Sequence, residues 1–239
     1  ETALITFTVN GNVPDLLGDF TGENYFKADK VETTFDDMFN FSRAGLATQV
    51  DSDGVLKWGA HNLMRRSEAP SNWGPQGAVI TNNAAIAPNG TETAVKIINN
   101  DGEDSRLQQP VGKQTPKRMT NAIFAKAAEW SFIQVALFTG SNYKASYVDL
   151  TDGSIVRDTT DETMVTDVGS GWFLIKSSNL CDGRLTISPG NSSAATLNAA
   201  TGKNSSLGDG ISGIYIWAGH VYRSDLGGMV NNPDRGDSY

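Results

Sequence analysis

The amino-acid sequence predicts an all-β protein built as an antiparallel sandwich or barrel. Short runs in which apolar and polar residues alternate recur along the chain, as expected of half-buried strands. Turn pairs separate these runs, and Asn-Gly or Asp-Gly supplies the positive φ that a tight antiparallel turn needs. Regularly spaced turns of this kind are typical of sandwiches and barrels. The pairs are Asn10-Gly11, Asp53-Gly54, Asn89-Gly90, Asp101-Gly102, Asp152-Gly153, Asp182-Gly183 and Pro189-Gly190.

The clearest strand is predicted over residues 3–9, where alternation ends at Asn10-Gly11. In the last predicted strand, Tyr215 and Trp217 share one face while Ile214 and Ile216 share the other, which suits a strand covered on both sides. Helical patterns over residues 14–20 and 33–39 suffice for only one or two turns each. The remaining strands are predicted over residues 77–80, 94–98, 122–125, 131–138, 145–150, 172–177, 183–188 and 211–221.

Composition indicates one large domain with an extension at each end. The chain has 239 residues, of which 38% are hydrophobic, enough for one sizeable core. Residues 1–38 have the pattern of an N-terminal strand and an acidic arm, and residues 226–239 form a short polar tail. Such segments seldom become ordered in isolation, so a neighbouring subunit is the simplest reason if they prove ordered.

Charge and residue usage exclude several function classes. A net charge of −8 is unfavourable for a nucleic-acid surface, which needs clustered Lys and Arg. The single cysteine, Cys181, excludes an intrachain disulfide, and no apolar run is long enough to indicate a membrane partner. The two histidines, His61 and His220, have neither a nucleophile motif nor a second metal ligand at suitable spacing. The sequence therefore predicts a protein that is not an enzyme.

A series of short motifs follows in a fixed order. It begins with Phe39, the pair Arg43-Ala44 and the turn at Asp53-Gly54, and continues with Asn62-Leu63-Met64-Arg65-Arg66, Trp73, Ala87-Pro88-Asn89-Gly90-Thr91, residues 147–155, Gly169-Ser170-Gly171-Trp172-Phe173-Leu174 and residues 210–222. In this order, they resemble a bacteriophage virion domain, a jelly-roll sandwich of carbohydrate-binding-module or concanavalin-like type. Domains of this kind are found in tail, fibre and capsid-appendage proteins. The chain departs from the resemblance at His220, where glutamine is usual.

The resemblance implies a jelly-roll β-sandwich over residues 39–225 and a strand, not a helix, in the alanine-rich segment 121–130. It also implies a non-enzymatic structural protein, present in many copies on the phage particle, that decorates the capsid or belongs to the tail or fibre apparatus. The expected partners are other virion proteins and further copies of the chain.

The alternative function is a lectin-like module on the virion that recognises host surface glycans. Sugar sites on sandwiches use exposed aromatic rings for stacking, and Trp58, Trp73 and Trp130 lie near predicted turns, where a ring can be exposed. Trp172 and Trp217 lie inside predicted strands and are assigned to the core.

No cofactor is expected other than a structural calcium ion, which jelly-roll modules often bind through loop oxygens. Asp51 and Asp53 resemble a fragment of a calcium loop, and Asp101-Gly102-Glu103-Asp104 is a second acidic loop. The alternative for both segments is an ordinary hairpin turn.

Overall fold

The computed structural model describes residues 62–64, 66–67, 69–109 and 116–224, together with five short strands before them. In the N-terminal region the helical prediction for residues 14–20 is wrong. Four of these residues form a strand that pairs antiparallel with the next strand along the chain. This pairing supplies backbone hydrogen bonds to a second segment, which an isolated helical turn does not have. The predicted strand 3–9 lies outside the described residues. The five strands are β1 (Leu16–Asp19), β2 (Asn24–Lys27), β3 (Glu32–Thr33), β4 (Thr48–Val50) and β5 (Leu56–Trp58).

The chain divides into two units, residues 1–45 and 46–239. The domain boundary expected after residue 38 stays a prediction. In the first unit β1, β2 and β3 form a small antiparallel sheet. In the second, β4 pairs antiparallel with β5 on either side of the predicted turn at Asp53-Gly54, and the turn itself lies outside the described residues. The predicted tail, residues 226–239, also lies outside them.

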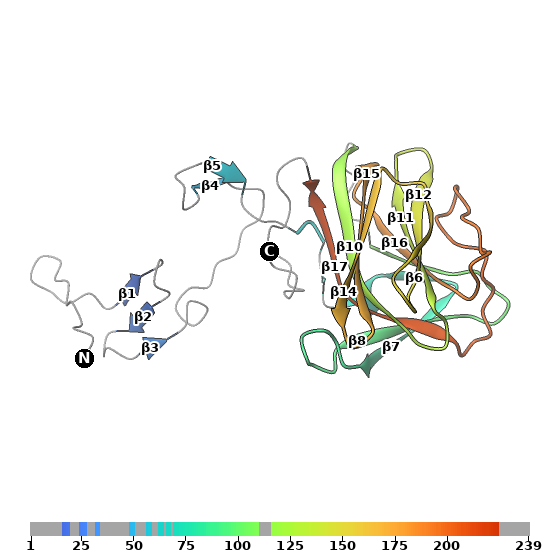
Figure 1. Cartoon of the computed structure of the whole chain (residues 1–239), viewed down its shortest axis with the longest axis horizontal. Helices are drawn as coiled ribbons and strands as arrows, with labels where there is room; N and C mark the ends of the chain where they lie inside the picture. The colour runs from blue at the N-terminus through green and yellow to red at the C-terminus, as the bar shows by residue number, and fades with distance from the viewer. Residues whose placement is uncertain are drawn as a thin grey trace, which may run out of the picture. The chain divides into compact units, whose positions relative to one another are not determined.

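Two six-stranded antiparallel sheets make up the sandwich of the second unit (Figure 1). Sheet I has the order β14-β15-β10-β17-β8-β7, and sheet II has the order β13-β12-β11-β16-β9-β6. A short 3-10 helix, η1 (Pro70–Asn72), precedes the first sandwich strand. The strands are β6 (Gly74–Gln76), β7 (Ala78–Ala85), β8 (Ala94–Asn99), β9 (Arg106–Gln109), β10 (Lys117–Ala127), β11 (Phe132–Phe138), β12 (Tyr143–Asp149), β13 (Ile155–Asp158), β14 (Glu162–Gly169), β15 (Trp172–Cys181), β16 (Leu185–Gly190) and β17 (Gly213–Arg223).

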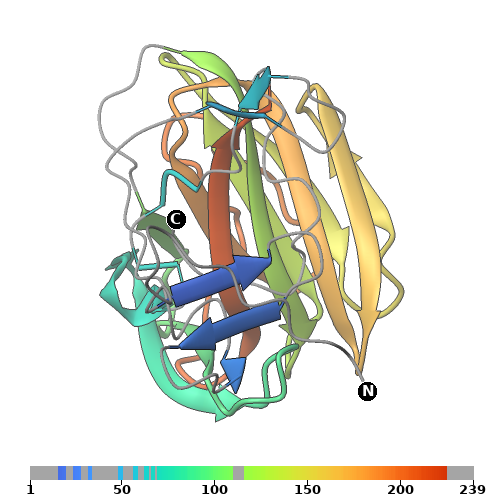
Figure 2. The ribbon, with the colours of Figure 1, turned by 90° about the vertical axis from the view of Figure 1, so that its left-hand side faces the viewer.

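The chain crosses repeatedly from one sheet to the other. It leaves sheet I after β8, returns at β10, and crosses again before β11, β14, β16 and β17. This wrapping produces an antiparallel jelly-roll sandwich, which confirms the predicted fold class. As expected, the alanine-rich segment contains a strand, since its residues 121–127 lie in β10. It lies between β15 and β17 in the middle of sheet I, and Figure 2 views these strands face on.

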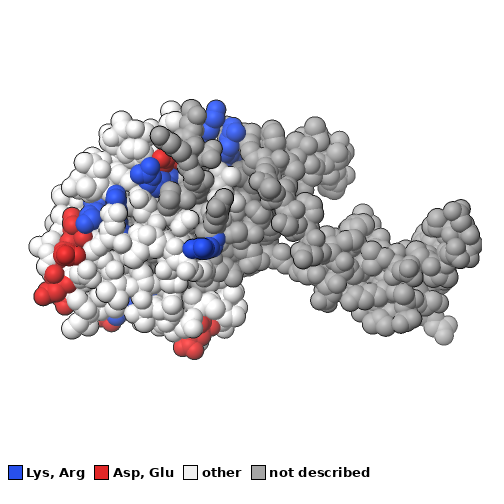
Figure 3. All heavy atoms as spheres, turned by 180° about the vertical axis from the view of Figure 1, so that it is seen from behind, with Lys and Arg blue, Asp and Glu red and all other residues white. Residues whose placement is uncertain are grey.

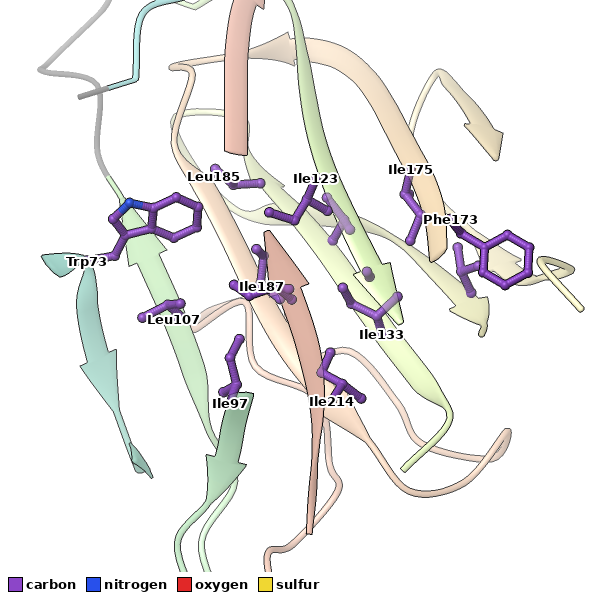
Figure 4. Close-up of a cluster of buried hydrophobic side chains, with 14 of the residues drawn as sticks. Trp73, Ile97, Leu107, Ile123, Ile133, Phe173, Ile175, Leu185, Ile187 and Ile214 are labelled. Carbon is purple, nitrogen blue, oxygen red and sulfur yellow. The ribbon is translucent and has the colours of Figure 1, made fainter. Parts of the chain in front are cut away.

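Alternation along the central strands places one set of side chains between the sheets. Ile123 of β10, Ile133 of β11 and Ile187 of β16 point into this space and have no exposed surface (Figure 4). The isoleucines of β17 point the same way, while Trp217 points to the opposite face and is equally buried. Both faces of β17 are therefore covered, as its sequence predicted.

Candidate functional site

The expected tryptophan platform does not exist at Trp73 and Trp130, because both side chains are buried in the core. Trp73 is 2% exposed and Trp130 is 8% exposed. The Trp73 indole Nε1–H donates to the Arg66 carbonyl at 3.1 Å, and its ring lies against Gly219, where an added Cβ would come within 2.4 Å of the ring. The prediction of exposure is thus wrong for these two residues. The side chain of Trp58, in β5, lies outside the described part of the structure.

The calcium prediction rests on Asp51 and Asp53, which lie outside the described residues. In the second acidic loop, the Glu103 carboxylate accepts a hydrogen bond from Asn100 at 3.1 Å, and Asp104 forms an ion pair with Lys203 at 2.9 Å. Within the described ranges, no group of three or more His, Cys, Asp or Glu side chains is arranged to hold a metal ion. The second acidic loop is therefore explained by its own polar contacts.

The outer face of sheet II is covered by the loop of residues 191–212. The phenol of Tyr147 donates to the Ser192 carbonyl at 2.8 Å, and the amide of Gln134 donates to the Gly202 carbonyl at 2.9 Å. Burial raises the pKa of Tyr147 to about 12, so the phenol keeps its proton. These bonds fasten the loop to β11 and β12.

A polar cluster around Tyr143 fastens the same loop further along. The phenol oxygen accepts hydrogen bonds from Arg106 at 3.2 Å, Gln108 at 2.8 Å and Arg184 at 3.3 Å. Arg106 also donates to the Thr201 carbonyl of the loop. Arg106 thus links β9 to the loop that covers this face, and Arg184, directly before β16, contacts the same phenol.

The outer face of sheet I carries a second apolar cluster at one end. Phe124 and Trp217 lie with ring centroids 5.3 Å apart, next to Trp172 and Leu174. The Trp172 indole Nε1–H donates to the Ile86 carbonyl at 3.1 Å, which holds the loop after β7 over the cluster. Trp172 and Trp217 are 1% and 0% exposed, which confirms their assignment to the packed interior.

A hollow of about 300 Å³ lies toward the other end of this face, and we call it the Tyr222 hollow. β10, β14, β15 and β17, which lie side by side in Figure 2, supply most of its lining. Tyr222 itself is 9% exposed and Met164 is 54% exposed. The lining residues are Thr120, Glu162, Met164, Lys176, Ser178, Tyr222 and Ser224.

The polar groups of the Tyr222 hollow are only partly satisfied by each other. The hydroxyls of Thr120 and Ser178 lie 2.8 Å apart, within hydrogen-bond distance. Burial raises the pKa of the Tyr222 phenol and outweighs a hydrogen bond with Thr120 that lowers it, so the phenol stays protonated. The side chains of Glu162 and Lys176 form no ion pair or hydrogen bond with other described residues. Both charges are therefore available to a ligand.

A second hollow of about 340 Å³, the Trp172 hollow, lies beside the apolar cluster. Lys126 is its one charged lining residue, and Ser170 is its one hydroxyl-bearing residue. On the face drawn in Figure 3, charged side chains of the described residues form separate small groups with uncharged surface between them. The two hollows thus differ in their side chains, since four hydroxyl groups line the Tyr222 hollow and one lines the Trp172 hollow. The Trp172 hollow is lined by Ile86, Ala87, Pro88, Gly90, Lys126, Val168, Gly169, Ser170 and Trp172.

Comparisons with known proteins give no family for this chain, since no family model and no curated protein matches it. In the described part of the chain, no helix is long and apolar enough to cross a membrane. The functional argument therefore rests on the sequence motifs together with the structure.

Proposed function

We propose that this chain is a non-enzymatic structural component of a bacteriophage virion. It is a multi-copy β-sandwich protein that decorates the capsid or forms part of the tail or fibre apparatus. The observation that carries the proposal is that motifs distant in the sequence fall on neighbouring strands of one sandwich. Residues 172–174 begin β15, residues 213–222 lie in β17, and both strands pair with β10. Two of the motifs on which the resemblance depends thus lie in one continuous sheet, and a third, at residues 147–155, begins in β12 of sheet II.

The rigidity of the sandwich supports a structural role. Side chains from both sheets fill its interior, and bonds from Tyr147, Gln134 and Arg106 fasten its longest described loop. In this proposal, the sandwich is the constant body of each subunit. The flanking residues contact other virion proteins or further copies of the chain.

Purified phage particles test this proposal. Peptide mass spectrometry of gradient-purified particles should detect the chain at many copies per particle. Antibodies against the sandwich should label one part of the particle in electron micrographs. If the chain stays in the lysate and no particle carries it after purification, the proposal is wrong.

The second candidate function is recognition of host surface glycans. The favouring observation is the Tyr222 hollow, whose hydroxyl and charged groups are suited to hydrogen bonding with sugars. The candidate glycan site on the described residues is therefore the outer face of sheet I and not the tryptophans selected from the sequence.

A further inference from the structure

We propose that the Tyr222 hollow is a binding site for a single neutral sugar ring of a host glycan. The inference rests on the second candidate function and not on the location of the chain in a virion. The proposed site lies on strands β10, β14, β15 and β17 and includes Ser224, which directly follows β17.

The composition of the lining is the first argument. Six of the seven lining side chains carry hydrogen-bonding groups, and four of these are hydroxyls, each able to donate and to accept. Sugar hydroxyls also do both, so a ring with several hydroxyls can satisfy such a lining from many directions. A purely apolar ligand would leave these groups without partners, which costs free energy for each buried one.

The two charges are the second argument. In the β14–β15 ladder, Glu162 lies opposite Ser178, and Met164 lies opposite Lys176. Glu162 and Lys176 are therefore diagonal neighbours, a relation in which side-chain origins lie about 7–8 Å apart. Hydroxyls on adjacent ring carbons can bridge a gap of this size. The opposite charges cancel, which favours a neutral ligand over one with net charge of either sign.

The size and the apolar wall are the third argument. A volume of about 300 Å³ lies at the lower limit for small-molecule pockets, so one ring fits better than an extended oligosaccharide. Met164 supplies a flexible, polarisable thioether that can pack against the C–H face of a sugar. The Trp172 hollow has one cation, Lys126, and one hydroxyl-bearing residue, Ser170, and its lining includes no acidic residue. It lacks this combination and provides an internal control.

Methionine methyl NMR tests the proposal on the full chain. The chain has five methionines, and labelling their methyl carbons gives a few resolved signals, with Met164 assigned through Met164→Leu. The probes are glucose, galactose, mannose and N-acetylglucosamine, with glucuronate and glucosamine as charged comparators. We expect at least one neutral sugar to shift the Met164 signal in a saturable way. The signals of Met64 and Met119, which are 1% and 0% exposed, should stay in place.

Matched variants identify the hollow. Lys176→Gln and Glu162→Gln should each weaken binding by about tenfold or more, since each removes a hydrogen bond to a charged group. Lys126→Gln, the same exchange in the Trp172 hollow, should change the affinity less than about twofold. Thermal unfolding of each variant confirms that it is folded.

Three results would overturn the inference. The first is no saturable shift at Met164 with any neutral sugar up to about 50 mM, a concentration that detects millimolar binding. The second is tighter binding of glucuronate or glucosamine than of every neutral sugar. The third is an equal loss of binding in Lys126→Gln and Lys176→Gln. None of them changes the proteins found on purified particles, so the virion proposal is tested separately.

Discussion

Replacing Trp73 by alanine should destabilise the sandwich and should not act through an exposed binding surface. The indole lies in the core between the sheets (Figure 4), and its ring contacts the backbone at Gly219. Its Nε1–H bond to Arg66 is the only one that the side chain can donate. An exposed glycan platform at this position would predict the opposite, a loss of binding with little change in stability.

The magnitude follows from the burial. A buried tryptophan removes about 200 Å² from water, and Trp73 is 2% exposed. At about 25 cal/mol per Å², this corresponds to roughly 5 kcal/mol. Residual compactness of the unfolded chain lowers the value to about 3–4 kcal/mol, within the usual range of about 3–5 kcal/mol for Trp→Ala changes in cores. For a chain of this size, the midpoint of thermal unfolding should fall by roughly 10 °C.

Equilibrium urea unfolding, followed by circular dichroism, measures this difference. Val79→Ala is the control, because Val79 is 55% exposed and its truncation should cost less than about 0.5 kcal/mol. A double-mutant cycle with Gly219→Ala sharpens the test. The added Cβ would lie 2.4 Å from the indole, and this clash is removed once Trp73 is alanine, which leaves Leu185 at 3.1 Å as the nearest neighbour. The two changes should therefore couple by about 1 kcal/mol or more. A loss below about 1 kcal/mol for Trp73→Ala, or purely additive effects, would refute the reasoning.

Two further outcomes follow from the packing. Gly213→Ala should lower the free energy of unfolding by about 1–3 kcal/mol, because its Cβ would lie 1.9 Å from the Ile97 carbonyl oxygen across the β8–β17 ladder. Gly74→Ala is the control for urea unfolding, since its nearest contact is an ordinary 3.5 Å. Burial raises the pKa of Cys181 from 9.0 to about 11, so a thiol reagent at pH 8 should label it only after unfolding, and labelling of the native protein would contradict this. The thiol's contribution to stability should be complete below about pH 9 and be lost as the pH rises through about 11.

The central strands could be predicted from the sequence because packing on both sides imposes strong patterns. The predicted strand 131–138 is β11 almost to the residue, and the prediction for 172–177 begins where β15 begins. The prediction for 122–125 covers only the middle of β10, which extends to Lys117. Lys117 and Arg118 at that end are exposed, so their residue types reveal little about pairing. Strand ends are thus less predictable than strand centres.

Three strands at the sheet edges, β6, β13 and β14, could not be predicted. β13 and β14 each have only one neighbour and expose much of their length, so they lack a continuous apolar face. In β14, Val165 packs toward the core while Met164 and Val168 are exposed, which conceals the alternation. Since β14 supplies Glu162 and Met164 to the Tyr222 hollow, the site could not be assembled from the sequence.

The tryptophan prediction failed for a different reason. Proximity to a turn says where a residue lies along the chain, but burial depends on what the fold brings to it. Trp73 follows η1 directly, yet Gly219 of β17 provides the space that its ring occupies. No local pattern contains both residues, and only the pairing of distant strands relates them.

The two outer faces of the sandwich are shielded from water in different ways. Each carries aromatic side chains that must be shielded from water, and on sheet II a single loop fastened through Tyr147 and Tyr143 covers them. On sheet I, the loop bonded to Trp172 lies over the apolar cluster, and the hydroxyls and charges of the Tyr222 hollow lie toward the other end of the face. The hydroxyls and charges of this hollow keep the outer face hydrated where none of the described loops covers it, and the same groups can exchange water for the hydroxyls of a sugar. Sheet I is therefore the face on which this rigid body can recognise a ligand without any change in its core.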